Sequence, residues 1–202
     1  MIDPEADRCH AEKMSRRKAA RDRIMAGMRG DAGLLIVHTG TGKGKSSAAF
    51  GMVLRCVGHD MRAGVVQFIK GAWDTAERRV LSGFPGLVTF LAMGEGFTWE
   101  TADRARDVAA AARAWEAARA MLTDPSYRMV VLDELNVALR YDQLSLDEVL
   151  PVLAARPEGQ HVVITGRGAP DELVAAADLV TEMTLVKHPF KAGIKAQPGV
   201  EF

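Results

Sequence analysis

Residues 39 to 47 have the types and spacing of a phosphate-binding loop. They are Thr39, Gly40, Thr41, Gly42, Lys43, Gly44, Lys45, Ser46 and Ser47. Glycines let the backbone fold so tightly that several N–H groups point at one anion, and a following helix adds partial positive charge. Lys45 adds a full positive charge, and Ser46 or Ser47 offers a hydroxyl to a magnesium ion on the phosphates. The pattern predicts a nucleotide phosphate site, although Thr39 stands where the motif G-x-x-x-x-G-K-[ST] begins with glycine.

Two further groups of charged residues follow apolar runs that we expect to be strands. Asp133 and Glu134 come directly after the run 129–132, a position from which a carboxylate holds magnesium in nucleotide enzymes. Arg167 follows the run 161–166 and can offer a fork of N–H groups to phosphate oxygens. The structural alternatives are a helix cap or solvated turn for the two acids, and a surface role for Arg167.

Strand-like and helix-like segments alternate along the chain from residue 34. The expected strands are 34–37, 63–70, 87–91, 129–134, 161–166 and 179–186. We expect one helix from the glycine loop to Gly58, a second at 77–81, and a third at 100–122 with Trp115 in the core. A fourth begins at Ser145 and contains Pro151, and a fifth begins at Pro170. Mostly apolar strands that alternate with helices indicate an α/β P-loop nucleotide-binding fold. We expect a mostly parallel sheet of about six strands with helices on both faces.

The first 32 residues differ in character from the rest. They are polar and mixed in charge, with a possible helix from Pro4 to Met28. We therefore expect an N-terminal polar arm at 1–32 and a nucleotide-binding domain at 33–202. The arm is either partly ordered or a basic segment that folds over a phosphate-rich site, and the sequence leaves both open.

Composition gives no reason to expect a nucleic-acid or membrane partner. Lys plus Arg and Asp plus Glu both number 26, so the formal net charge is zero. No apolar run approaches the length of a membrane span, and the N-terminus lacks the apolar core of a signal peptide. The two cysteines, Cys9 and Cys56, form no disulfide framework. We expect a cytoplasmic protein.

Several motifs in order resemble those of the ATP:corrinoid adenosyltransferases. They lie at 39–51, 66–71, 94–101, 131–136, 165–167 and 187–202, so the resemblance covers residues 34–202. Thr41 replaces the commoner Asn, which weakens the transfer of any nucleotide contact at that position. Ser46 and Ser47 replace Thr-Thr and keep the hydroxyl that magnesium needs.

The resemblance implies transfer of the 5′-deoxyadenosyl group of ATP to the Co(I) centre of a corrinoid, with release of triphosphate. It implies Lys45, Arg167, Phe97 and Trp99 as catalytic residues; residues 39–47 and Asn136 as nucleotide-binding; and Ser46, Asp133 and Glu134 as magnesium ligands. Phe97 and Trp99 would form an apolar wall against the lower face of the cobalt and exclude an axial ligand; the alternative is that they cap the core. No general base is required, so His38 is expected to pack or to contact the nucleotide. We expect Lys45 to be exposed.

The family also implies a homodimer and a reducing protein partner such as a flavoprotein. Two other functions stay open: a P-loop phosphotransferase or ATPase, whose product would be ADP, and an ATP-gated corrinoid-binding module that forms no cobalt–carbon bond. The basic segment 187–197 and the aromatic pair fit a corrinoid beside ATP and favour the adenosyltransferase.

Overall fold

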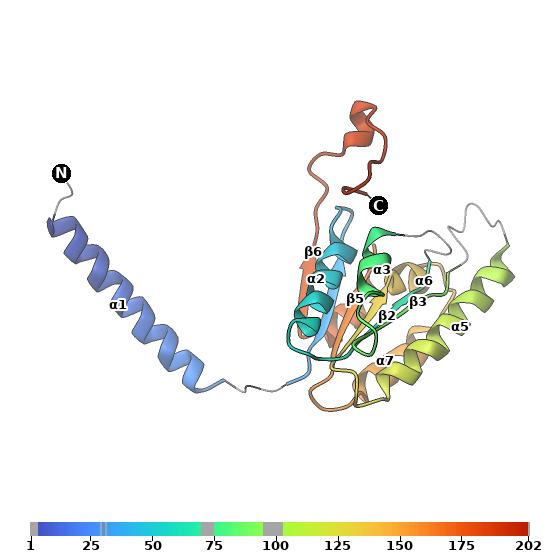
Figure 1. The fold of residues 1–202 in the computed structure, drawn as a ribbon, viewed down its shortest axis with the longest axis horizontal. Coiled ribbons are helices and arrows are strands. Elements are labelled where there is room, and N and C mark those ends of the chain that lie inside the picture. The colour runs from blue at the N-terminus through green and yellow to red at the C-terminus, as the bar shows by residue number, and fades with distance from the viewer. Residues whose placement is uncertain (1–3, 29, 31, 70–74, 95–102, 202) are drawn as a thin grey trace. The chain divides into compact units, whose positions relative to one another are not determined.

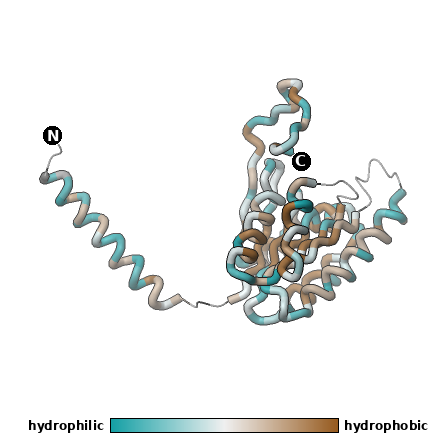
Figure 2. Tube along the Cα trace, in the orientation of Figure 1, coloured by the Kyte–Doolittle hydropathy of each residue, from teal (hydrophilic) through white to brown (hydrophobic). Residues whose placement is uncertain are grey.

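The structure, a computed structural model, describes residues 4–28, 30, 32–69, 75–94 and 103–201. The chain falls into two compact units, Met1–Ala32 and Gly33–Phe202. In the first unit, helix α1 spans Pro4–Ala26, and its described side chains are exposed. Figure 2 colours this helix mainly hydrophilic, whereas hydrophobic segments gather among the strands of the second unit. The second unit therefore holds the core.

A six-stranded parallel sheet forms the centre of the second unit (Figure 1). Its strands are β1 Leu35–Thr39, β2 Ala63–Gln67, β3 Val88–Ala92, β4 Met129–Asp133, β5 His161–Thr165 and β6 Leu179–Glu182. Their order is β3-β2-β4-β5-β1-β6, and every neighbouring pair is parallel. The predicted α/β class and strand number are confirmed.

Four strands are shorter than the sequence predicted: β4 and β5 by one residue each, and β2 and β6 by three and four residues. Strand β2 ends at Gln67 instead of residue 70, because its partner β4 ends opposite it at Asp133. Strand β6 ends at Glu182 instead of residue 186, because β1 ends opposite it at Thr39, where the glycine loop begins. An apolar run therefore predicted each strand, but the neighbouring strand determined its end.

Helices cover both faces of the sheet, as predicted. One face packs against α2 Lys45–Val57 and α3 Ala76–Leu81. The other packs against α5 Arg104–Leu122, α6 Leu135–Arg140, α7 Leu146–Ala154 and α8 Asp171–Ala176. Trp115 on α5 is 4% exposed, which confirms its predicted place in the core.

The helix boundaries follow local signals with a few differences. The predicted start of α5 at residue 100 is wrong, because Asp103 is extended and caps the helix by accepting from the Arg106 N–H. Helix α2 ends before Gly58 as predicted, but Gly58 is right-handed and Asp60 takes the left-handed conformation. The sequence missed the short helix α6. Pro151 lies inside α7, which continues to Ala154.

His161 at the start of β5 gives the fold a pH-sensitive contact at the edge where the strands begin. Its Nδ1 accepts a hydrogen bond from the Leu34 N–H at 3.1 Å, which requires this nitrogen to carry no proton. Burial lowers the pKa of His161 below its ordinary 6.5, and the nearby cations Arg128 and Arg156 lower it further.

We expect the free energy of unfolding to fall as the pH drops below about 6.5. In that range the unfolded chain binds a proton at His161 that the folded chain resists, so stability is full above 6.5 and is lost toward the lower folded pKa. His161→Gln keeps an acceptor but cannot titrate, so its stability should change less between about pH 7.5 and 5.5. Urea unfolding of both proteins at these pH values measures the difference. Parallel losses in the two proteins would assign the pH dependence to other groups.

Candidate nucleotide site

The phosphate-binding loop connects β1 to α2. Gly44 caps α2 in a left-handed conformation (φ 103°), so Lys45 is the first helical residue. A backbone segment from the other end of the chain lies against this loop: the Gly42 N–H donates to the Met183 oxygen at 2.6 Å, and the Met183 N–H donates to the Thr39 oxygen at 2.9 Å. A Cβ atom at Gly40 would lie 2.5 Å from the Met183 oxygen, so the contact excludes a side chain there. The segment after β6 thus forms one wall of the loop.

Lys45 is buried, which corrects the expectation of an exposed side chain. It is only 7% exposed, and its Nζ donates to the carbonyl oxygens of Gly40 (2.9 Å) and Gly42 (2.5 Å). Burial has the largest effect and lowers the pKa of Lys45 below its ordinary 10.5. Of the neighbouring charges, the carboxylates of Glu134 and Asp133 raise this pKa, and the cations Arg167 and Lys43 lower it. The ammonium is therefore held by the loop and surrounded by the charged residues that the sequence singled out.

Arg167 reaches the same edge of the sheet from the loop after β5. Its side chain is exposed, and the loop that carries it is tied to the phosphate loop, because the Ala169 N–H donates to the Thr39 hydroxyl at 3.2 Å. Thr39 stands where the phosphate-loop motif has its first glycine, and its hydroxyl connects the two loops. The structure places Arg167 close enough to Lys45 to lower that residue's pKa.

Asp133 and Glu134 have different surroundings at the end of β4. Asp133 is fully buried, and its two carboxylate oxygens accept from the Gln67 amide (2.8 Å) and the Thr165 hydroxyl (2.7 Å). Glu134 is half-buried and left-handed (φ 65°), a conformation that costs a non-glycine residue about 1 kcal/mol. Between these two acids, Glu134 is the one whose carboxylate has access to a ligand.

The other predicted nucleotide-binding residues lie in the phosphate loop, in the first turn of α2 and in α6. Ser46 in the first turn of α2 is half-buried, and Ser47 and Thr41 are exposed. Asn136 is fully buried; its Nδ2 donates to the Gly166 oxygen at 3.0 Å, and its Oδ1 has no hydrogen-bond partner among the residues that the structure describes. His38 is 3% exposed with its Nδ1 3.3 Å from the Lys45 oxygen, so it packs beneath the loop.

Phe97 and Trp99 lie outside the described residues, so the structure says nothing of the predicted apolar wall. The described chain before them passes close to the end of β2: a Cβ atom at Gly94 would lie 2.4 Å from the Ile69 oxygen. A side chain at Gly94 would therefore push the two segments apart.

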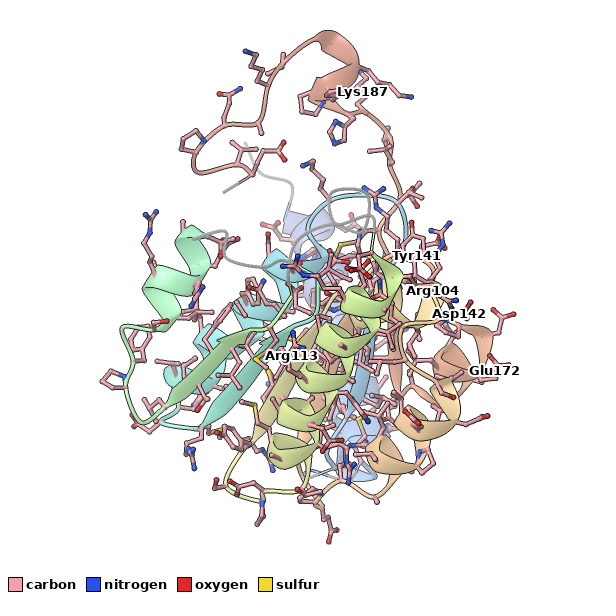
Figure 3. The ribbon with its side chains drawn as sticks, turned by 90° about the vertical axis from the view of Figure 1, so that its right-hand side faces the viewer. Arg104, Arg113, Tyr141, Asp142, Glu172 and Lys187 are labelled. Carbon is pink, nitrogen blue, oxygen red and sulfur yellow. The ribbon has the colours of Figure 1, made fainter. Side chains whose placement is uncertain are left out.

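The C-terminal segment adds a contact that the sequence did not predict. Glu201 forms an ion pair with Lys43 of the phosphate loop, and its side chain is 16% exposed against 47% for Lys43. Between this pair and β6 lies the predicted basic segment, which contains a 3₁₀ helix, Pro189–Ala192, and an exposed Phe190. Figure 3 shows Lys187 on this segment and Arg104 at the start of α5.

The profile of the ATP:corrinoid adenosyltransferases BtuR/CobO/CobP matches residues 31–202. The chain belongs to this family. It is 58% identical over 199 residues to the corrinoid adenosyltransferase of Pseudomonas aeruginosa, with 98% of each chain covered. It is 47% identical over 190 residues to the corrinoid adenosyltransferase CobA of Salmonella typhimurium, covering 93% of this chain and 96% of that one. The Escherichia coli K12 enzyme is 45% identical over 197 residues, covering 98% and 100%.

Among solved structures, the KaiC-like protein PH0186 of Pyrococcus horikoshii aligns with a TM-score of 0.48 and 14% identity, covering 81% of this chain and 77% of that one. At this level it adds nothing to the family assignment. No helix in the described ranges has the length and apolar character to cross a membrane.

Four residues of this adenosyltransferase site escaped the sequence reasoning: Gln67, Thr165, Met183 and Glu201. Gln67 lies within the family motif at 66–71 and Thr165 opens the motif at 165–167, but their hydrogen bonds to Asp133 follow only from the order of the strands. Met183 and Glu201 reach the loop from beyond β6. Glu201 lies within the family motif at 187–202, but no local pattern pairs either residue with the loop.

We expect Glu201→Gln to strengthen binding of inorganic tripolyphosphate by roughly two- to fivefold, the range for an exposed ion pair. The substitution removes a negative charge beside the phosphate loop and leaves Lys43 unpaired by Glu201. Titration calorimetry at low salt measures the effect, and added salt should reduce it. Glu158→Gln is the matched control, because it removes the same charge in the turn before β5, at the opposite edge of the sheet. Weaker binding by the Glu201 variant would show instead that this carboxylate positions Lys43 for the phosphates.

Proposed function

We propose that this protein transfers the 5′-deoxyadenosyl group of ATP to the Co(I) centre of a corrinoid. The observation that carries the proposal is the family match over residues 31–202, with the phosphate-loop lysine, Arg167 and Glu134 gathered at one edge of the sheet. Relatives named corrinoid adenosyltransferase align over nearly the whole chain. The same loop alone would also suit a kinase or an ATPase, so the family match decides between them.

In this reaction the electron pair of Co(I) attacks C5′ of the ribose and the bond from C5′ to the phosphate oxygen breaks. The bonding electrons leave on that oxygen, so negative charge grows on the departing triphosphate. Lys45, which donates to glycine carbonyls of the loop, would stabilise this charge, and Arg167 and Lys43 would add positive charge nearby. Co(I) carries no proton to remove, which explains why the site needs no general base.

We propose that magnesium binds with the triphosphate and is held by Ser46 and Glu134. Magnesium takes oxygen ligands, keeps several waters, and is often bound by one or two protein groups together with substrate phosphates. The residues fit this pattern: Ser46 and Glu134 are half-buried oxygen donors, and Glu134 lies close enough to Lys45 of the phosphate loop to raise its pKa. Magnesium would neutralise charge on the leaving triphosphate. Asp133 would not bind the magnesium ion directly, because Gln67 and Thr165 already donate hydrogen bonds to its two carboxylate oxygens.

Phe97 and Trp99 are proposed to exclude the lower axial ligand of the cobalt, so that Co(II) becomes easier to reduce. The basis is their place in the family motif at 94–101. Replacing both with alanine should reduce turnover from Co(II) and a mild reductant by roughly three- to tenfold. Turnover from chemically prepared Co(I), which already lacks the ligand, should survive much better. Equal loss in both assays at an unchanged melting temperature would contradict this role.

The family resemblance also motivates three proposals: a homodimer, a cytoplasmic location, and a reducing protein such as a flavoprotein that supplies the electron to Co(II). The dimer is checked by light scattering, where a mass near the 21.8 kDa of one chain would exclude it. The electron donor is checked by replacing the chemical reductant with a reduced flavoprotein. Failure of reduced flavoproteins to support turnover from Co(II) would exclude that donor.

Anaerobic incubation with ATP, magnesium and chemically reduced corrinoid tests the function. We expect inorganic triphosphate and a light-sensitive adenosyl–cobalt product in equal amounts. Corrinoid-independent release of ADP would support a phosphotransferase or ATPase instead. Binding of both ligands without a cobalt–carbon bond would support the corrinoid-binding module.

A further inference from the structure

Thr165 at the end of β5 connects the two acidic residues of the site. Its hydroxyl donates to Asp133 Oδ1 at 2.7 Å and accepts from the Glu134 N–H at 3.0 Å. Thr165 is fully buried, as is Asp133. One side chain therefore satisfies both a carboxylate oxygen of one acid and the backbone of the next.

The hydrogen bond to the Glu134 backbone matters because Glu134 is left-handed and begins a helix. Its φ of 65° is unfavourable for a residue with a Cβ atom, so neighbouring contacts must hold it. The Glu134 carboxylate also lies beside the loop of Arg167: a Cβ atom at Gly166 would be 3.2 Å from Glu134 Oε2. A small change at the Glu134 backbone would redirect this carboxylate relative to the phosphate loop.

Gln67 provides the comparison within the same network. Its amide donates to the other oxygen of Asp133 at 2.8 Å, and it is 1% exposed. It is paired in register with Asp133 across β2 and β4. Both Gln67 and Thr165 thus satisfy the buried Asp133 carboxylate, but Thr165 also holds the Glu134 N–H.

We propose that Thr165 is a positioning residue that aims the Glu134 carboxylate at the magnesium–triphosphate complex. This rests on the proposed function, in which Glu134 contacts magnesium. Thr165 is fully buried and bonded to the Glu134 backbone, so in this proposal it acts through that backbone and not by contact with metal or substrate. The hydroxyl is needed for both contacts, so serine can replace threonine and valine cannot.

The test compares ATP binding with magnesium and with EDTA, and takes the ratio of the two affinities. In Thr165→Val this ratio should fall at least fivefold relative to wild type, while ATP binding in EDTA changes less than twofold. Thr165→Ser should keep the ratio within twofold of wild type. An unchanged ratio in the valine variant overturns the proposal but leaves the proposed function standing. A wild-type ratio of one overturns both the proposal and the magnesium site.

Gln67→Leu separates positioning from loss of stability. Each variant removes one donor from the same buried carboxylate, so both should lower the melting temperature. Only the Thr165 variant should lower the ratio of ATP affinity with magnesium to ATP affinity with EDTA. An equal fall of this ratio in Gln67→Leu would mean that the effect comes from loss of a hydrogen bond to Asp133, and would overturn the proposal. Should the valine variant fail to fold, amide exchange in the wild-type protein still decides. Slow exchange of the Glu134 N–H supports the contact, and exchange at the rate of an open amide overturns it.

Discussion

Replacing Lys45 with methionine should lower kcat/KM by roughly ten- to a hundredfold or more. A charge-assisted contact to the triphosphate contributes about 1.5–3 kcal/mol, and the substitution removes it while keeping a side chain of similar length. Lys45 also donates hydrogen bonds to two glycine carbonyls. Removing those contacts should therefore lower stability modestly, by about 1 kcal/mol.

Steady-state kinetics and tripolyphosphate binding measure the loss, and thermal unfolding checks the fold. Lys43→Met is the matched control, since Lys43 lies on the same loop but is 47% exposed and paired with Glu201. It should lose less activity and little stability. If the Lys45 variant keeps a near-normal kcat/KM, this lysine has no part in the mechanism. If both variants lose equally, the general charge of the loop matters and the buried position of Lys45 does not.

The sequence predicted the sheet well because its central strands are buried on both faces. All five residues of β4 are buried, so the strand appears as an unbroken apolar run that ends in two acids. The same reasoning brought the glycine loop, Asp133 and Arg167 to one edge, because ligands bind at the carboxyl ends of parallel strands. What local patterns could not supply was the end of each strand, which depends on where its partner stops.

Several contacts that hold the site together are long-range, so no local pattern in the sequence indicates them. Lys43 and Glu201 are 158 residues apart in sequence, and Gln67 and Asp133 are 66 apart. Lys45 was expected to be exposed, but its ammonium donates to two carbonyl groups of its own loop. A strand-order prediction would have placed Gln67 and Thr165 on either side of Asp133, since β2, β4 and β5 are neighbours.

Gly40→Ala should lower the free energy of unfolding more than any other alanine substitution of a glycine in the phosphate loop. Gly40 combines a left-handed φ of 92° with no space, because an added Cβ atom would lie 2.5 Å from the Met183 backbone oxygen. The strain and the displaced backbone together should cost about 2–4 kcal/mol of stability. The loop that survives should bind tripolyphosphate at least tenfold more weakly, since its N–H groups no longer converge on one anion.

Three other glycines separate the two causes. Gly42 has no positive φ but its Cβ atom would lie 2.7 Å from the Met183 oxygen, whereas Gly44 has a φ of 103° with only the flexible Met183 sulfur nearby at 3.6 Å. Gly51 in α2 has neither problem, so Gly51→Ala should raise stability by about 0.5–1 kcal/mol. Urea unfolding of the four alanine variants measures the costs. If the close contact with the Met183 backbone is the main reason for glycine in this loop, Gly42→Ala loses more stability than Gly44→Ala. The reverse order would mean that the left-handed backbone conformation is the main reason.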